Sequence, residues 1–214
     1  MASTLHRADR LQTGGVPAAE ARKVMIMVHG RGADARSILQ LGQYLETQDA
    51  AFLAPQATGN TWYPYSFLAP IADNEPGISS GLAVLRELVD GQLAAGFAPE
   101  QIYLLGFSQG ACLVLEFAAR NPRPYGGVFG LSGGLIGPTG TPRDYPGSFG
   151  GAPVFLGCSD VDSHIPKARV LETANVLTRM GANVTTRLYP NAPHTILEDE
   201  IEAVRKGMDQ DSQD

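Results

Sequence analysis

The sequence contains little of what marks several large classes of protein. Only two of its 214 residues are cysteines, Cys112 and Cys158, each within an apolar stretch, so we expect buried thiols rather than a disulfide framework. The formal net charge is −6, and the basic stripe that binds a phosphate backbone is missing, so we expect no nucleic-acid partner. No run of about 18 apolar residues occurs, so we expect no stable membrane insertion. Residues 1–15 lack the apolar core of a secretory signal, and we therefore expect a cytoplasmic protein.

What the sequence does contain is enough apolar material for one sizeable core. Hydrophobic residues make up 43% of the chain and charged residues 18%, a balance typical of a globular domain. The length suits a single domain, which we place at residues 1–208. The acidic end, residues 209–214, is expected to be a disordered tail.

Short apolar runs alternate with helical patterns along the whole chain. Strands are predicted at 23–30, 50–56, 101–107, 127–134 and 152–158, and a more polar strand near a sheet edge at 185–190. Helices are predicted at 34–48, 78–95, 109–120, 166–180 and 195–208. This alternation indicates an α/β fold, with a mostly parallel sheet and helices on both faces. Ligands of such sheets bind beyond the carboxyl ends of the strands.

A serine lies between two glycines at one of those strand ends. Residues 106–110, GFSQG, match the pattern G-x-S-x-G and stand between a predicted strand and a predicted helix. Glycines at 106 and 110 would let the strand and the helix approach closely around a sharp, strained turn. A glycine-rich turn with an incidental serine is the alternative, but the strand–helix context favours Ser108 as a nucleophile.

A serine nucleophile needs a base, and the base needs an orienting acid. In a fold with this turn, the acid and then the histidine follow the serine along the chain. His6 precedes the core and is expected on the surface, and His29 precedes the serine. His194 follows the last predicted strand, which makes it the candidate base.

Two carboxylates are candidates for the acid. Asp160 and Asp162 both follow the strand at 152–158. They could instead be turn-forming aspartates, or they could form a metal site with His164 in the pattern D-x-D-x-H. No further cluster of ligands is apparent, so we expect no metal.

The negative charge that develops during ester cleavage needs two backbone N–H donors. We expect one from Gln109, directly after the serine, and one from Arg31, in the loop HGRGAD after the first long strand. Because these are main-chain roles, we expect the two side chains to be free to vary. A plain glycine turn is the alternative for residues 29–32, and the pattern of a phosphate-binding loop is absent.

The segments VMIMVHGRGAD, LLGFSQGACLVLEFA, DSHIP and YPNAPHTI resemble the phospholipase/carboxylesterase family of α/β-hydrolases, which includes acyl-protein thioesterases. The resemblance extends from about residue 23 to about residue 205. It implies an α/β-hydrolase fold, serine esterase activity without a cofactor, and a homodimer as a further expectation, since many members are dimers. The family pattern D-x-x-V-P corresponds here to residues 162–166, which selects Asp162 over Asp160 as the acid.

Two features differ from the family pattern. Little sequence precedes the strand at 23–30, so the N-terminal antiparallel edge of the sheet is expected to be shortened. The loop at 60–76 holds four of the 16 aromatic residues, and the resemblance implies that it lines the substrate pocket. We expect the pocket to contain Trp62, Tyr65, Phe67 and His29. A packed surface loop is the alternative for this segment.

These observations predict a serine carboxylesterase that acts through an acyl-enzyme. Small acyl or aryl esters are the expected substrates, because an aromatic wall suits a compact group better than a long acyl chain; thioesters and lysophospholipids are further candidates. A dienelactone-hydrolase-like activity is less consistent, since that chemistry prefers cysteine where this chain has Ser108. The alternative from another class is a non-catalytic small-molecule-binding protein on the same fold.

Overall fold

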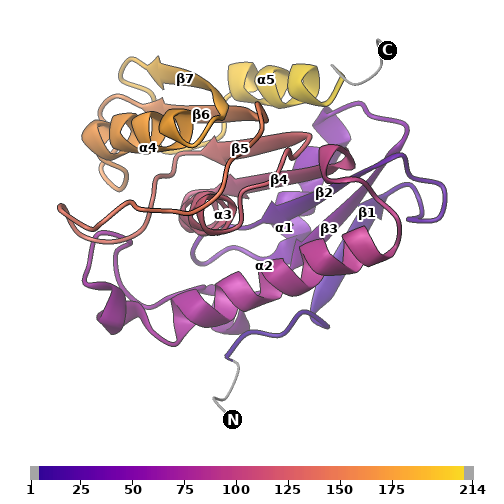
Figure 1. Cartoon of the computed structure of the whole chain (residues 1–214), viewed down its shortest axis with the longest axis horizontal. Coiled ribbons are helices and arrows are strands. Elements are labelled where there is room, and N and C mark those ends of the chain that lie inside the picture. Colours follow the sequence, from indigo (N-terminus) through magenta and orange to yellow (C-terminus); the bar gives the residue numbers. More distant parts are fainter. Residues whose placement is uncertain (1–4, 210–214) are drawn as a thin grey trace.

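The computed structural model describes residues 5–209 (Figure 1). Seven strands form one sheet in the order β1–β3–β2–β4–β5–β6–β7. The strands are β1 (Leu11–Gly15), β2 (Lys23–Val28), β3 (Ala50–Pro55), β4 (Ile102–Phe107), β5 (Gly127–Leu131), β6 (Pro153–Ser159) and β7 (Asn183–Tyr189). The α-helices are α1 (Ala35–Leu39), α2 (Gly77–Ala94), α3 (Gln109–Arg120), α4 (Lys167–Arg179) and α5 (Glu198–Asp209). The predicted α/β fold is confirmed, while the tail predicted after Asp209 lies outside the described residues.

Strands β2 to β7 run parallel, so their carboxyl ends share one edge of the sheet. Strand β1 pairs antiparallel with β3 and forms the N-terminal edge. This short strand was not located from the sequence, because LQTGG offers little apolar signal. It agrees with the expectation of a shortened antiparallel edge. The strand predicted near an edge is β7, the last strand of the sheet.

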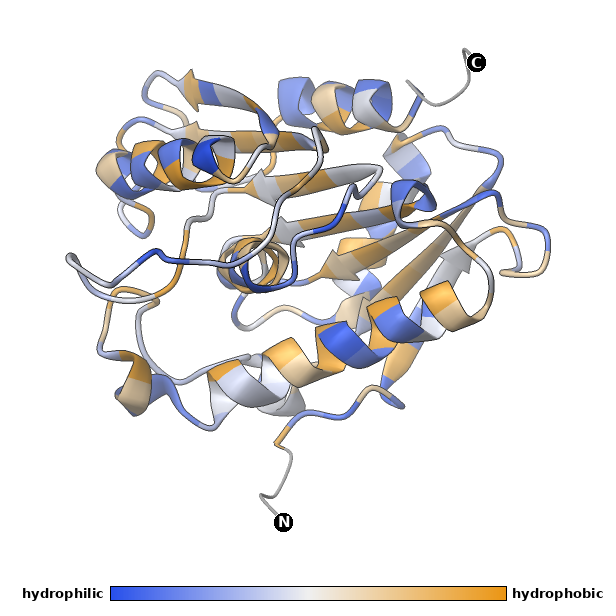
Figure 2. Ribbon diagram, in the orientation of Figure 1, coloured by the Kyte–Doolittle hydropathy of each residue, from blue (hydrophilic) through white to orange (hydrophobic). Residues whose placement is uncertain are grey.

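The sheet buries a separate apolar layer on each face. Val24, Ile26 and Val28 of β2 belong to the layer that α2, α3 and α4 cover, and Figure 1 looks onto this side. Met25 and Met27 point to the opposite layer, which α1 and α5 cover. Side chains alternate between the faces of a strand, so a strand covered on both sides is apolar throughout. Figure 2 shows this difference: the central strands are mostly hydrophobic, whereas helix α2 has hydrophobic and hydrophilic bands.

Two local expectations were wrong. The helix predicted at 34–48 is only the short α1, followed by a tighter 3₁₀ turn at Gln40–Tyr44. Gly42 in that turn lies against the ring of Phe52, where a Cβ would come within 2.8 Å of the ring. His6, expected on the surface, is 2% exposed. Its imidazole accepts the N–H of Thr58 and donates to the carbonyl of Trp62, so it joins the N-terminal segment to the loop after β3.

Both cysteines are buried free thiols, as the sequence predicts. Among residues 5–209, no helix combines the length and the apolar character needed to cross a bilayer.

Candidate active site

Ser108 occupies the turn between β4 and α3. Its backbone angles, φ 54° and ψ −118°, are ones that side-chain-bearing residues rarely adopt. The N–H of Ser108 donates to the carbonyl of Leu131 at the end of the neighbouring strand β5. The strained turn is thus held by the sheet and presents the hydroxyl at the carboxyl edge, as the sequence predicts for this motif.

The two glycines around the serine are needed because three main-chain segments meet there. A Cβ on Gly106 would lie 2.4 Å from the carbonyl oxygen of Gly110. A Cβ on Gly110 would lie 2.2 Å from the carbonyl oxygen of Val28 in β2. Neither position has room for a methyl group, so the sharpness of the turn depends on both glycines.

Three side chains from separate loops meet in one hydrogen-bonded row. His194 follows β7, and its Nε2 lies 2.9 Å from the hydroxyl oxygen of Ser108. Its Nδ1 lies 2.6 Å from Oδ2 of Asp162, which follows β6. With the proton on Nδ1, the imidazole donates to the carboxylate and can accept the serine proton at Nε2.

The carboxylate of Asp162 is fully buried and has several donors. Its Oδ1 accepts the main-chain N–H groups of His164 and Ile165 at 2.8 and 3.0 Å, which leaves Oδ2 for His194. Burial of the carboxyl opposes its ionisation. The hydrogen bonds from His194 and from the two N–H groups outweigh that effect and lower the pKa of Asp162. A charged carboxylate at this point holds the imidazole in one orientation.

The candidate oxyanion donors lie beside the serine. Gln109 is the first residue of α3, and Arg31 follows the end of β2 by three positions. Within residues 5–209, neither main-chain N–H has a hydrogen-bond acceptor. The N-terminus of α3 adds the positive end of a helix dipole to the same place. A substrate carbonyl there would meet unoccupied donors.

Comparison with protein families gives a match over residues 15–210 to the phospholipase/carboxylesterase family. The chain belongs to this family. Its members are ester-cleaving hydrolases. The family match therefore agrees with the fold described above.

Individual relatives agree with the family match. Acyl-protein thioesterase 1 of Saccharomyces cerevisiae is 28% identical over 203 residues, which cover 85% of this chain and 89% of the relative. A solved phospholipase/carboxylesterase from Dyadobacter fermentans is 44% identical, with a TM-score of 0.92, and the match covers 97% of this chain and 99% of that one. The structure of esterase PE8 is 25% identical, with a TM-score of 0.74, over 91% of this chain and 95% of that chain.

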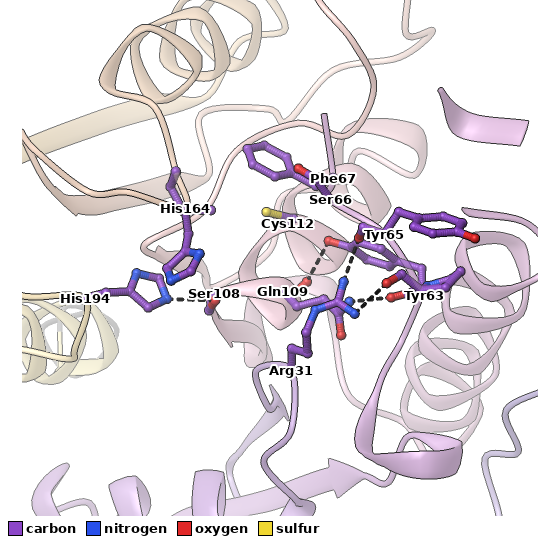
Figure 3. Close-up of a pocket in the computed structure, with 12 residues that line it drawn as sticks. Arg31, Tyr63, Tyr65, Ser66, Phe67, Ser108, Gln109, Cys112, His164 and His194 are labelled. Atoms are coloured by element: carbon purple, nitrogen blue, oxygen red, sulfur yellow. Dashed lines mark hydrogen bonds between the residues drawn. The ribbon is translucent and has the colours of Figure 1, made fainter. Parts of the chain in front are cut away.

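A cavity of about 380 Å³ opens next to Ser108 (Figure 3). Tyr65 and Phe67, two of the four residues expected in the substrate pocket, line this cavity. Trp62 and His29, which were predicted there as well, do not line it. Both side chains are fully buried, and the indole N–H of Trp62 donates to the carbonyl of His29.

The side chains of the two candidate oxyanion residues have a function that the sequence did not reveal. The amide of Gln109 accepts the N–H of Trp62 and donates to the carbonyl of Tyr63, each at 2.8 Å. The guanidinium of Arg31 donates to the carbonyls of Pro64 and Tyr65 at 2.8 and 2.6 Å. Our expectation that these side chains are free to vary was therefore wrong. Together they fasten residues 62–65 to the strand ends.

A further residue of the loop adds to this attachment. Asn74 is fully buried, accepts the N–H of Tyr65 and donates to the carbonyl of Ser66, both at 2.8 Å. The aromatic wall is therefore set by side-chain amides and a guanidinium that bond to main-chain groups. In the sequence, the only hint of this attachment is that polar residues such as Asn74 occur within the otherwise apolar segment 60–76.

Asp160, Asp162 and His164, which the sequence analysis considered as alternative metal ligands, each interact with a different group. Asp160 accepts the N–H of Asn191 and ties the loops after β6 and β7 together. Asp162 is engaged with His194, and the ring of His164 stands edge-on to His194 with 4.9 Å between centroids. Among residues 5–209, no three histidine, cysteine or acidic side chains are grouped so that they could hold a metal ion.

Proposed function

We propose that this protein hydrolyses small carboxylic esters through an acyl-enzyme formed on Ser108. The observation that carries the proposal is the row Ser108–His194–Asp162, with its contacts of 2.9 and 2.6 Å. These side chains come from three loops at one edge of the sheet, and a binding protein would have no use for all three in this order.

In the first half of the reaction, the Ser108 oxygen attacks the ester carbonyl carbon while His194 Nε2 takes the hydroxyl proton. The N–H groups of Arg31 and Gln109 donate to the resulting oxyanion. The bond to the leaving oxygen or sulfur then breaks, and His194 returns its proton to the leaving group. Asp162 stabilises the imidazolium between these steps. In the second half, water attacks the acyl-serine with His194 as base, which releases the acid and restores the serine.

The cavity favours a compact substrate. A volume of about 380 Å³ is near the low end for small-molecule sites, and hydrogen bonds from Arg31, Gln109 and Asn74 hold the aromatic wall in place. Small acyl or aryl esters fit this space best. The name of the yeast relative extends the proposal to short acyl thioesters. Lysophospholipids stay a weaker candidate, because their acyl chains are long.

The nearby thiol of Cys112 is not proposed as the nucleophile. It lines the cavity, but burial raises its pKa to about 12, so the reactive thiolate is scarce at neutral pH. This agrees with the sequence-based preference for a serine hydrolase over a dienelactone-hydrolase-like enzyme.

Covalent labelling tests the proposal. We expect a fluorophosphonate to modify Ser108, as located by peptide mass spectrometry, and to abolish hydrolysis of p-nitrophenyl butyrate. His194→Ala should slow both labelling and turnover, whereas Ser108→Ala should remove both. A Ser108 that stays unlabelled in a folded protein without hydrolytic activity would favour the non-catalytic binding protein instead, and an active protein with Ser108 unlabelled would show that another group is the nucleophile.

The expected homodimer and the cytoplasmic location stay predictions. Light scattering of the purified chain tests the first, and fractionation of cells that express it tests the second.

A further inference from the structure

The cavity next to Ser108 has an unusual charge balance for this chain. None of its twelve lining residues is acidic, although the chain as a whole has a net charge of −6. Arg31 is the only lining residue that carries a full charge at neutral pH whatever its surroundings. The two lining imidazoles, His164 and His194, can only add positive charge. The carboxylate of Asp162 is fully buried behind His194.

Among residues 5–209, the guanidinium of Arg31 has no acidic partner. Within residues 5–209, it forms no ion pair, and its two hydrogen bonds go to the neutral carbonyls of Pro64 and Tyr65. A guanidinium has five N–H donors, so three remain for another acceptor. The side chain is exposed and faces the cavity from the side opposite His164 (Figure 3).

Position adds a constraint on distance. The main-chain N–H of Arg31 is a proposed oxyanion donor, so its guanidinium lies no more than one side-chain length from the reacting carbonyl. An anionic group that reaches it must therefore belong to the same small molecule as the ester and lie within about the length of an arginine side chain from the ester carbonyl. The positive end of α3 strengthens the field at the same place.

We propose that the preferred substrates are short esters that also carry a carboxylate, which binds the guanidinium of Arg31. This inference rests on the proposed esterase function and specifies its substrate class. The tyrosine and phenylalanine wall holds the apolar part of such a molecule, and the guanidinium donates a forked pair of N–H groups to the two carboxylate oxygens.

The test uses pairs of esters that differ only in a carboxylate or its neutral amide. Monomethyl succinate and methyl succinamate place the group on the acyl side; 3-acetoxybenzoate and 3-acetoxybenzamide place it on the alcohol side. Each kcat/KM is divided by the rate of hydroxide-catalysed hydrolysis of the same ester. We expect the charged member of one pair to be preferred about tenfold or more at low ionic strength. The preference should shrink in 0.5 M salt, because salt screens an exposed charge.

Variants separate the charge of Arg31 from its hold on the loop. Arg31→Met should reduce the carboxylate-to-amide ratio to about one, and Arg31→Lys should keep part of it. Asn74→Ala is the matched control, because it removes two hydrogen bonds to the same loop but no charge. Its ratio should equal that of the wild type. Because only ratios are compared, a general loss of rate in any variant does not affect the result.

Calorimetry measures the affinity of Ser108→Ala for each ester of the same pairs. This measurement does not depend on turnover. Tighter binding of the carboxylate, together with no hydrolysis of any ester by the wild type, would contradict the proposed function but support the charge preference. Equal kcat/KM and equal binding of charged and neutral members would overturn the inference and leave the esterase proposal standing. A ratio that survives in Arg31→Met would also overturn it.

Discussion

The two sides of the active-site cavity are built by different means. On the strand side, the main chain fixes the geometry: Ser108 lies in a strained turn that two glycines and the carbonyl of Leu131 hold in place. On the loop side, side chains do the fixing, since Gln109, Arg31 and Asn74 bond to main-chain groups of residues 62–66. We infer that the strand side is rigid and sets the chemistry, whereas the loop side can be loosened and sets the fit of the substrate.

The largest effect is expected on the strand side, from Ser108→Ala. The variant should fold normally and lose activity by about 10⁴-fold or more, because the nucleophile is gone while the rest of the site remains. Ester hydrolysis and thermal unfolding measured on the same preparation check this. Activity within tenfold of the wild type would contradict the assigned role of the serine.

A substitution at Gly110 should damage the strand side through its backbone. In Gly110→Ala, the new methyl group would come within 2.2 Å of the carbonyl of Val28, so we expect a loss of about 2–4 kcal/mol in unfolding free energy together with loss of activity. Gly91→Ala is the matched control, because position 91 lies inside α2 with no atom within 4 Å of the added Cβ. That variant should be stable, with a gain of about 0.5–1 kcal/mol. Equal stabilities for the two, by urea unfolding, would refute the close-approach argument.

On the loop side, Gln109→Ala should weaken substrate binding more than it slows the chemical step. It keeps the main-chain N–H but leaves the N–H of Trp62 and the carbonyl of Tyr63 without partners, at a cost of about 1–3 kcal/mol. We expect KM to rise more than kcat falls, and a small fluorophosphonate to label Ser108 at nearly the wild-type rate. A selective loss of kcat with unchanged KM would instead mean that this side chain serves the reacting atoms.

The smallest effect concerns a buried acid behind the site. Glu200 of α5 is 1% exposed, and its Oε2 accepts the N–H of Leu197. Its Oε1 has no hydrogen-bond partner in the part of the chain that the structure describes. Burial and, to a smaller extent, the charge of Asp199 raise the pKa of Glu200 to about 7, although the hydrogen bond from the N–H of Leu197 acts in the opposite direction. The folded protein therefore holds this proton more tightly than the unfolded chain does.

The sign of the pH effect follows from that difference. Stability falls as pH rises from the unfolded pKa of about 4.5 to the folded value of about 7, and then levels off. Glu200→Gln keeps an acceptor for Leu197 and cannot ionise, so we expect it to gain up to about 3 kcal/mol on the wild type between pH 5 and pH 8. Urea unfolding of both proteins at the two pH values measures this. A difference that does not change with pH would show that folding does not shift the pKa of Glu200.

The sequence predicts the strand side of the cavity better than the loop side. The strand side depends on local patterns, such as apolar runs that end in glycine and a serine between glycines. These predicted Ser108 and His194 at one edge of the sheet and left Asp160 and Asp162 as candidates, of which the family resemblance selected Asp162. The elements β2 to β7 and α2 to α5 were located within a few residues for the same reason.

The loop side could not be predicted in this way, because it depends on contacts between distant residues. The imidazole of His6 is bonded to Thr58 and Trp62, which lie more than 50 positions away. The side-chain amide of Gln109 donates to the carbonyl of Tyr63, 46 positions away. Trp62 was expected in the pocket because the resemblance assigns its loop to the pocket lining, and His29 was expected there with it, whereas both are fully buried outside the lining. Single-residue patterns carry no information about such pairings.

Trapping the acyl-enzyme tests the central claim most directly. The enzyme would be mixed with p-nitrophenyl acetate, quenched in acid within one turnover, and digested for mass spectrometry. Our account predicts one acetyl group on the peptide that contains Ser108, and none on that peptide in Ser108→Ala. Rapid turnover with Ser108 unmodified, or acetyl found on Cys112 instead, would contradict it.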